Sequence, residues 1–166
     1  MASVAFVEER VMFSPNMPAE VNSLLQAAVA VSSIDQSRAE KLFLQAQTLD
    51  SHCLQTYFAL YKFYFFQKRL VDAERVVLAG LEESAEQGGF PNDYRQLAQS
   101  QPKWNLYAND GTLFYLYTLK ALAFIKLRQG FTTDAQLVLS HLQQLDPKDL
   151  SGASVIMDLA AGITES

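Results

Sequence analysis

Few residues of this chain could take part in covalent or metal chemistry, and their spacing favours neither. The chain has one cysteine, Cys53, and two histidines, His52 and His141. Successive helical residues point about 100° apart, so His52 does not face Cys53. His141 lies 88 positions beyond Cys53, and three such ligands are too few for a structural zinc site. We expect no catalytic residue, metal or cofactor, and interpret Cys53 as a buried small hydrophobic residue.

Length and composition indicate one folded globular domain, and the absence of a catalytic constellation argues against enzyme activity. The chain has 166 residues, of which 49% are hydrophobic and 19% charged, which is typical of a packed core. A net charge of −5, with no basic run, argues against a nucleic-acid partner. No apolar run is long enough to span a bilayer, and Glu8 and Glu9 interrupt any signal peptide. We therefore expect a cytoplasmic protein without a membrane partner.

Hydrophobic spacing predicts an all-α fold with short turns. We expect residues 1–17 to form a flexible or extended N-terminal arm and residues 18–166 to form a single domain. Prolines and glycines at the segment ends, among them Pro147 and Gly130, are typical helix boundaries. A further short helix is an open alternative over 91–100. The seven expected helices span about 18–31, 36–49, 52–68, 69–86, 110–128, 133–145 and 149–163.

Three of these helices share one pattern of small and bulky residues. Ala39 is followed by Phe43 four positions later, and Ala73 is followed by Val77 in the same way. Ala73 follows Ala39 by 34 residues, which is the period of a tetratricopeptide array. A small residue at these places lets the second helix of a pair approach the first closely. The pattern returns at Ala135, 62 residues after Ala73 and thus 28 residues late.

With these positions aligned, the chain resembles the tetratricopeptide family over about residues 20–148. Units begin at Glu20, Leu54 and Leu116, and the first is degenerate, with Ser23 where a large aromatic residue is usual. Tyr61 stands where glycine or alanine is usual. The resemblance implies a right-handed α-α superhelix of about three helix pairs, an insertion at about 82–110 before the last pair, and a capping helix at about 149–163.

The insertion is too rich in large apolar residues to be a disordered loop. Connections longer than about 12–15 residues without structure of their own are uncommon in compact domains. We expect the insertion to fold back against the array through four aromatic anchors: Phe90, Tyr94, Trp104 and Tyr107.

The resemblance also implies a concave partner-binding groove formed by the first helices of successive pairs. The family's groove positions fall on nine residues: Gln55, Phe58, Lys62, Phe65, Phe66, Tyr117, Lys120, Phe124 and Arg128. Such a groove suits an apolar protein or peptide segment that carries acidic residues, and indicates an adaptor or scaffold. Aromatic stripes at helical spacing are also typical of a core, and an exposed aromatic groove would need a cover. A partner, a second copy, the insertion or the arm could supply it.

Two alternatives stay open. Length, acidity and repeat number resemble the tetratricopeptide chaperones of type III secretion, which keep membrane-inserting clients soluble, although the insertion is not part of that pattern. The weakly charged face of the last helix, at Val155, Ile156, Leu159 and Ile163, instead suggests a self-assembling structural homodimer.

Overall fold

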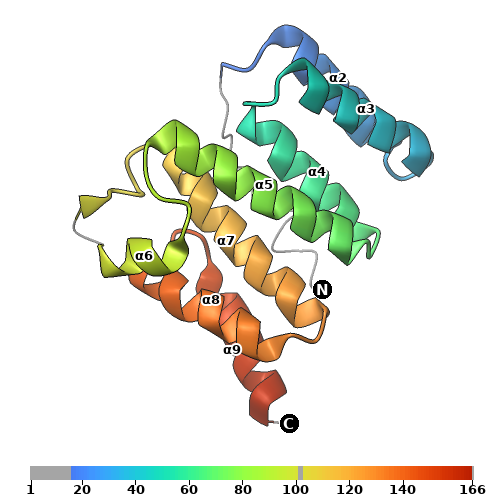
Figure 1. The fold of residues 1–166 in the computed structure, drawn as a ribbon. Helices are drawn as coiled ribbons and strands as arrows, with labels where there is room; N and C mark the ends of the chain where they lie inside the picture. Colours follow the sequence, from blue (N-terminus) through green and yellow to red (C-terminus); the bar gives the residue numbers. More distant parts are fainter. Residues whose placement is uncertain (1–15, 101–102, 166) are drawn as a thin grey trace. The chain divides into compact units, whose positions relative to one another are not determined.

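The computed structural model describes residues 16–100 and 103–165, with side chains up to residue 162. Over this described part the chain forms eight α-helices and no strand, which confirms the predicted all-α class. The predicted arm lies, up to residue 15, outside the described residues. Figure 1 shows the helices in order: α2 (Ala19–Val31), α3 (Gln36–Leu49), α4 (Leu54–Phe66), α5 (Leu70–Gly88), α6 (Tyr94–Gln99), α7 (Asp110–Arg128), α8 (Thr132–Leu145) and α9 (Ala153–Glu165).

The helices belong to two compact units, residues 1–76 and residues 77–166, called unit 1 and unit 2. The division lies within α5, between Val76 and Val77. The small residues that suggested the repeat are fully buried, Ala39 and Ala73 in unit 1 and Ala135 in unit 2. The predicted single domain and its right-handed superhelix stay predictions.

The predicted helix ends are accurate to within two residues, except at the start of α9. α4 begins at Leu54 instead of 52, because the Asp50 carboxylate accepts a hydrogen bond from the His52 N–H (3.0 Å) and holds a turn there. α9 begins at Ala153 instead of 149. Asp149 has a left-handed φ of 55°, which a helix interior does not allow. Its carboxylate instead accepts hydrogen bonds from the Ser154 N–H and hydroxyl.

In unit 1, α2 and α3 form a helical hairpin that packs against α4 through α3 (Figure 1). Asp35 begins α3 as its N-cap, where its carboxylate accepts a hydrogen bond from the Arg38 N–H (3.0 Å). The Phe43 ring of α3 lies 5.0 Å from the Phe63 ring of α4, centroid to centroid. The buried side of α3 therefore faces α4.

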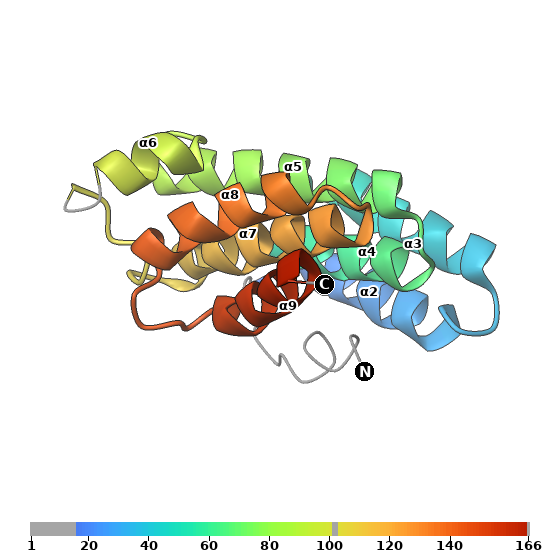
Figure 2. The ribbon, with the colours of Figure 1, turned by 90° about the horizontal axis from the view of Figure 1, so that it is seen from below.

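In unit 2, α7 packs against α8 and α9, and α8 also packs against α6 (Figure 2). A reciprocal capping box between Asn109 and Thr112 begins α7. Gly130 adopts a left-handed φ of 87° between α7 and α8, as expected of a glycine that ends a helix. This turn folds α8 back along α7.

The insertion folds back onto unit 2, as predicted. Phe90 is buried and meets the Tyr115 ring edge-on, with 5.0 Å between centroids, and Trp104 lies beside Phe90 at 6.5 Å. Tyr94 packs on His141 of α8, and the Tyr107 hydroxyl donates a hydrogen bond to Asp146 (2.5 Å). Phe90, Tyr94 and Tyr107 thus contact α7, α8 and the C-terminal end of α8, respectively, and Trp104 packs on Phe90 within the insertion.

Glycine is required where the insertion begins. A Cβ at Gly88 would lie 2.4 Å from the nearest carbon of the buried Phe90 ring. Gly89 then takes a φ of 70°, which only glycine adopts without strain. These two glycines end α5 and bring Phe90 back beneath it.

Candidate functional site

In unit 1, two of the five predicted groove residues lie in the core. Phe58 and Phe65 are 3% and 7% exposed, Gln55 and Lys62 are half-buried, and Phe66 is exposed. The Lys62 ammonium lies 4.7 Å from the centroid of the Phe58 ring, and burial lowers the pKa of Lys62. The described side chains of this set present Phe66 alone as an open aromatic surface.

Two of the four predicted groove residues of unit 2 are buried. Lys120 and Phe124 are buried, Tyr117 is half-buried and Arg128 is exposed. The Lys120 ammonium lies 5.2 Å from the Tyr117 ring centroid. Burial lowers the pKa of Lys120 to about 8, although Asp149 and Asp146 favour its charged form. In this conformation the aromatic residues Phe58, Phe65 and Phe124 are part of the core, which is the alternative that the sequence left open.

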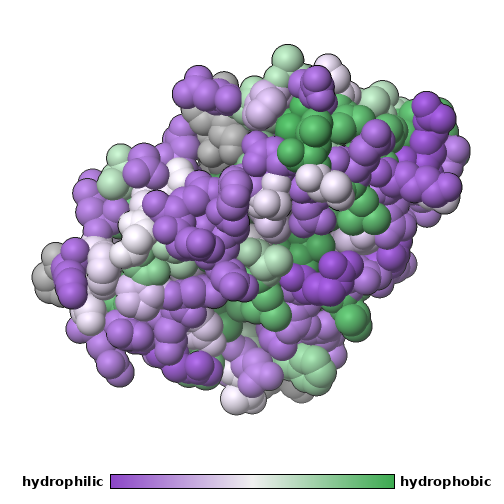
Figure 3. All heavy atoms as spheres, turned by 45° about the horizontal axis from the view of Figure 1, so that its top comes forward, coloured by the Kyte–Doolittle hydropathy of each residue, from purple (hydrophilic) through white to green (hydrophobic). Residues whose placement is uncertain are grey.

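The open groove of unit 1 lies elsewhere, between α2 and α3. It has a volume of about 1040 Å³, at the upper end of the range for small-molecule pockets. Apolar side chains lie exposed along it, since Leu44 is 37% exposed and Leu49 is 50% exposed. Figure 3 shows apolar atoms gathered over α2 and α3. Its lining, here called the α2–α3 groove, is Ala19, Glu20, Ser23, Leu24, Lys41, Leu44, Gln45, Thr48 and Leu49.

The α2–α3 groove arises because α3 exposes leucines outside its buried side. Ala39, Phe43 and Ala46 are buried. Leu44 lies one residue, or about 100°, from Phe43 and therefore faces away from that buried stripe. Leu49 is half exposed. The signal that sequence reasoning missed is the pair Leu44 and Leu49, which lie outside the buried stripe.

The lining combines four apolar residues with five polar or charged ones. Among its described residues, the ionisable side chains are Glu20 and Lys41, and the other polar groups are two hydroxyls and one amide. Lys41 forms no ion pair with any described residue. An apolar surface with a few polar groups at its edge is typical of a site that holds another protein segment.

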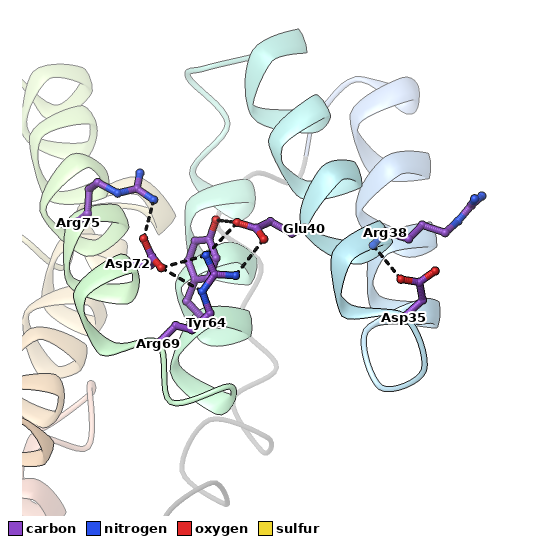
Figure 4. A network of polar contacts seen from close by, with 7 residues as sticks. All are labelled: Asp35, Arg38, Glu40, Tyr64, Arg69, Asp72 and Arg75. Atoms are coloured by element: carbon purple, nitrogen blue, oxygen red, sulfur yellow. Dashed lines mark hydrogen bonds and ion pairs between the residues drawn. The ribbon is translucent and has the colours of Figure 1, made fainter.

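A polar network lies where α3 meets α4. Glu40 of α3 accepts two hydrogen bonds from the Arg69 guanidinium (2.9 and 3.1 Å) and one from the Tyr64 hydroxyl (2.7 Å) (Figure 4). Arg69 also pairs with Asp72 of α5 (2.9 Å), and its guanidinium carbon lies 4.5 Å from the Tyr64 ring centroid. The network joins α3, α4 and the start of α5.

These contacts shift the pKa values of their members. Hydrogen bonds from Arg69 and then Tyr64 hold the pKa of Glu40 below its ordinary value. Burial, together with the hydrogen bond to Glu40, raises the pKa of Tyr64 to about 12. At neutral pH Glu40 is therefore an anion and Tyr64 a neutral donor, which is the pairing that the geometry requires.

We expect Glu40→Gln to lower the free energy of unfolding by about 1 kcal/mol at neutral pH, because the ion pair that it removes is partly exposed. The folded-state pKa of Glu40 lies below the unfolded value. Its contribution is therefore full above that unfolded value and is lost as the pH falls through the folded one. Urea unfolding from about pH 6 to about pH 3 should show the difference between wild type and variant shrinking. A difference that grows on acidification would contradict this prediction.

Comparison of the chain with protein families, curated proteins and solved structures gives no match. The tetratricopeptide resemblance accordingly stays a prediction. In the described residues, no helix is long and apolar enough to cross a membrane, and no three His, Cys, Asp or Glu side chains gather as metal ligands. The fold and the site define an all-helical protein whose unit 1 carries an open apolar groove between two helices.

Proposed function

We propose that this protein is a protein-interaction adaptor that binds an amphipathic helix of its partner in the α2–α3 groove. The observation that carries the proposal is the exposure of Leu44 and Leu49 along an open groove between two helices. Such a groove accepts the apolar ridge of a third helix. The proposal assigns the protein no catalytic role and a cytoplasmic location.

The proposal moves the binding surface away from the predicted aromatic positions. Phe58, Phe65 and Phe124 are buried, so a partner could reach them only after the side chains that cover them move. Leucines already at the surface need no such rearrangement. A partner helix with leucine-sized residues and an acidic residue near Lys41 would match the lining.

The test is capture of partners from the source cells by three forms of the tagged protein. Leu44→Glu places a charge in the groove and should reduce the amount of the captured partner at least about tenfold. Val71→Glu is the matched control, because Val71 is 77% exposed on α5 and lies outside the lining. It should capture as much as wild type.

Gln45→Trp provides a second variant, since Gln45 is exposed and lines the groove. It fills the groove while leaving the core unchanged, and it should also reduce capture. Capture that is unchanged by both groove variants, each shown by circular dichroism to be folded, would disprove the proposal. A captured membrane-inserting client would favour the chaperone alternative for the same groove.

A further inference from the structure

α9 carries an exposed strip that is complementary to the α2–α3 groove. The strip comprises Val155, Asp158, Leu159 and Gly162, which share one helix face at spacings of three and four residues. Val155 and Leu159 are exposed, while Ile156 and Ala160 pack inward. A Cβ added at Gly162 would meet nothing within 4 Å. α9 therefore has a second, uncovered apolar side.

The charges of the two surfaces also match. Asp158 is the one ionisable residue between Ala153 and Gly162, and Lys41 is the one basic residue among those that line the α2–α3 groove. Neither forms an ion pair with another residue in the described ranges. Asp158 and Lys41 are therefore opposite in charge, and the lining also includes the acidic Glu20.

The spacing of these groups agrees in one orientation. Leu44 follows Lys41 by three residues, and Asp158 follows Val155 by three residues. The rise along the helix from Lys41 to Leu44 is about 4.5 Å, and so is the rise from Val155 to Asp158. An α9 helix that runs antiparallel to α3 can therefore place Asp158 beside Lys41 and Val155 beside Leu44.

We infer that the occupant of the α2–α3 groove is α9 of a second copy of this chain. The inference rests on the proposed function, because it names the partner helix of the same groove. Both surfaces are exposed in the single chain, so each is available to another copy. The contact joins two different surfaces, and a copy with one of them disabled can still use the other.

Sedimentation of the purified chain over a range of concentrations tests the inference. Wild type should exceed its single-chain mass of 18.6 kDa in a concentration-dependent way. Leu44→Glu and Leu159→Glu should each weaken self-association at least about tenfold. Val71→Glu and Leu137→Glu are the matched controls, since both residues are exposed and lie outside the two surfaces, and they should assemble as wild type does.

Mixing the two disabled variants gives the sharper result. Leu44→Glu retains the α9 strip and Leu159→Glu retains the groove, so an equimolar mixture should form a one-to-one complex although each variant alone is monomeric. A mixture that stays monomeric would overturn the inference.

A charge swap tests the orientation. Lys41→Glu and Asp158→Lys should each weaken assembly roughly fivefold, and the double variant should return to within about twofold of wild type. These surface changes avoid the core. A double variant weaker than either single change would contradict the pairing.

Failure of this inference is distinguishable from failure of the proposed function. A wild type that is monomeric at every concentration, with partner capture still lost in Leu44→Glu, would overturn the inference and leave the adaptor proposal standing. Unchanged assembly and unchanged capture in folded Leu44→Glu would overturn both.

Discussion

Replacing Asp146 by alanine should lower the free energy of unfolding by about 3 kcal/mol, which for a chain of this size is a fall in Tm of about 6–12 °C. The carboxylate is 4% exposed at the C-terminal end of α8. It accepts hydrogen bonds from the Tyr107 hydroxyl (2.5 Å), the Ser151 hydroxyl (2.6 Å) and two backbone N–H groups, those of Leu150 and Ser151 (2.9 Å each).

The expected effect is large because the alanine would leave several buried donors without an acceptor. Each unsatisfied buried donor costs about 1–3 kcal/mol, less where water can enter. Asp146 also joins three parts of unit 2, since Tyr107 belongs to the insertion and Ser151 to the turn that leads into α9. Loss of the carboxylate therefore loosens the insertion and the α9 turn together.

Chemical unfolding of wild type, Asp146→Ala and the control Asp134→Ala measures the effect. Asp134 is exposed in the first turn of α8, so its loss should cost under about 1 kcal/mol. Equal stabilities for the two variants would show that the Asp146 network does not hold unit 2 together.

Replacing Phe43 by alanine should lower the free energy of unfolding by about 3–5 kcal/mol. The Phe43 side chain is 2% exposed, and its ring packs at 5.0 Å on that of Phe63. Removing the ring leaves a cavity between α3 and α4, and helices that are also held by the Glu40–Arg69 pair cannot close it fully. The loss therefore includes both the buried area and the cavity.

The neighbouring residue provides the control. Leu44 lies next to Phe43 on the same helix but is 37% exposed, so Leu44→Ala should cost under about 1.5 kcal/mol. Thermal and urea unfolding of the two variants, measured side by side, should separate them clearly. If Leu44→Ala were as damaging as Phe43→Ala, the assignment of the two sides of α3 would be wrong, and with it the α2–α3 groove.

The fold could be predicted from the sequence because its helices have clear ends and one strong period. Gly130, Asp35 and Asn109 each end or begin a helix at or within one residue of the expected place. The small residues Ala39, Ala73 and Ala135 are all fully buried, as close helix packing requires. The aromatic residues of the insertion were enough to predict that it packs against the helices and is not a disordered loop.

The candidate site could not be predicted in the same way. α4 has apolar residues around most of its circumference, and periodicity cannot tell which side of such a helix is covered. Phe58 and Phe66 are both phenylalanines of α4 with apolar neighbours in the sequence, yet Phe58 is buried and Phe66 is exposed. The α2–α3 groove depends on Leu44 and Leu49, and helical periodicity alone does not indicate that these leucines are exposed.

The central claim is that the α2–α3 groove binds a protein helix. A photo-crosslinking amino acid placed at Gln45 in the otherwise wild-type chain, within its source cells, tests this most directly, with the same probe at the exposed Val71 as the control. We predict a discrete covalent protein adduct at position 45, absent from position 71 and lost when Leu44→Glu is added. No adduct at position 45 above that at position 71, or an adduct that persists in the folded Leu44→Glu chain, would contradict the claim.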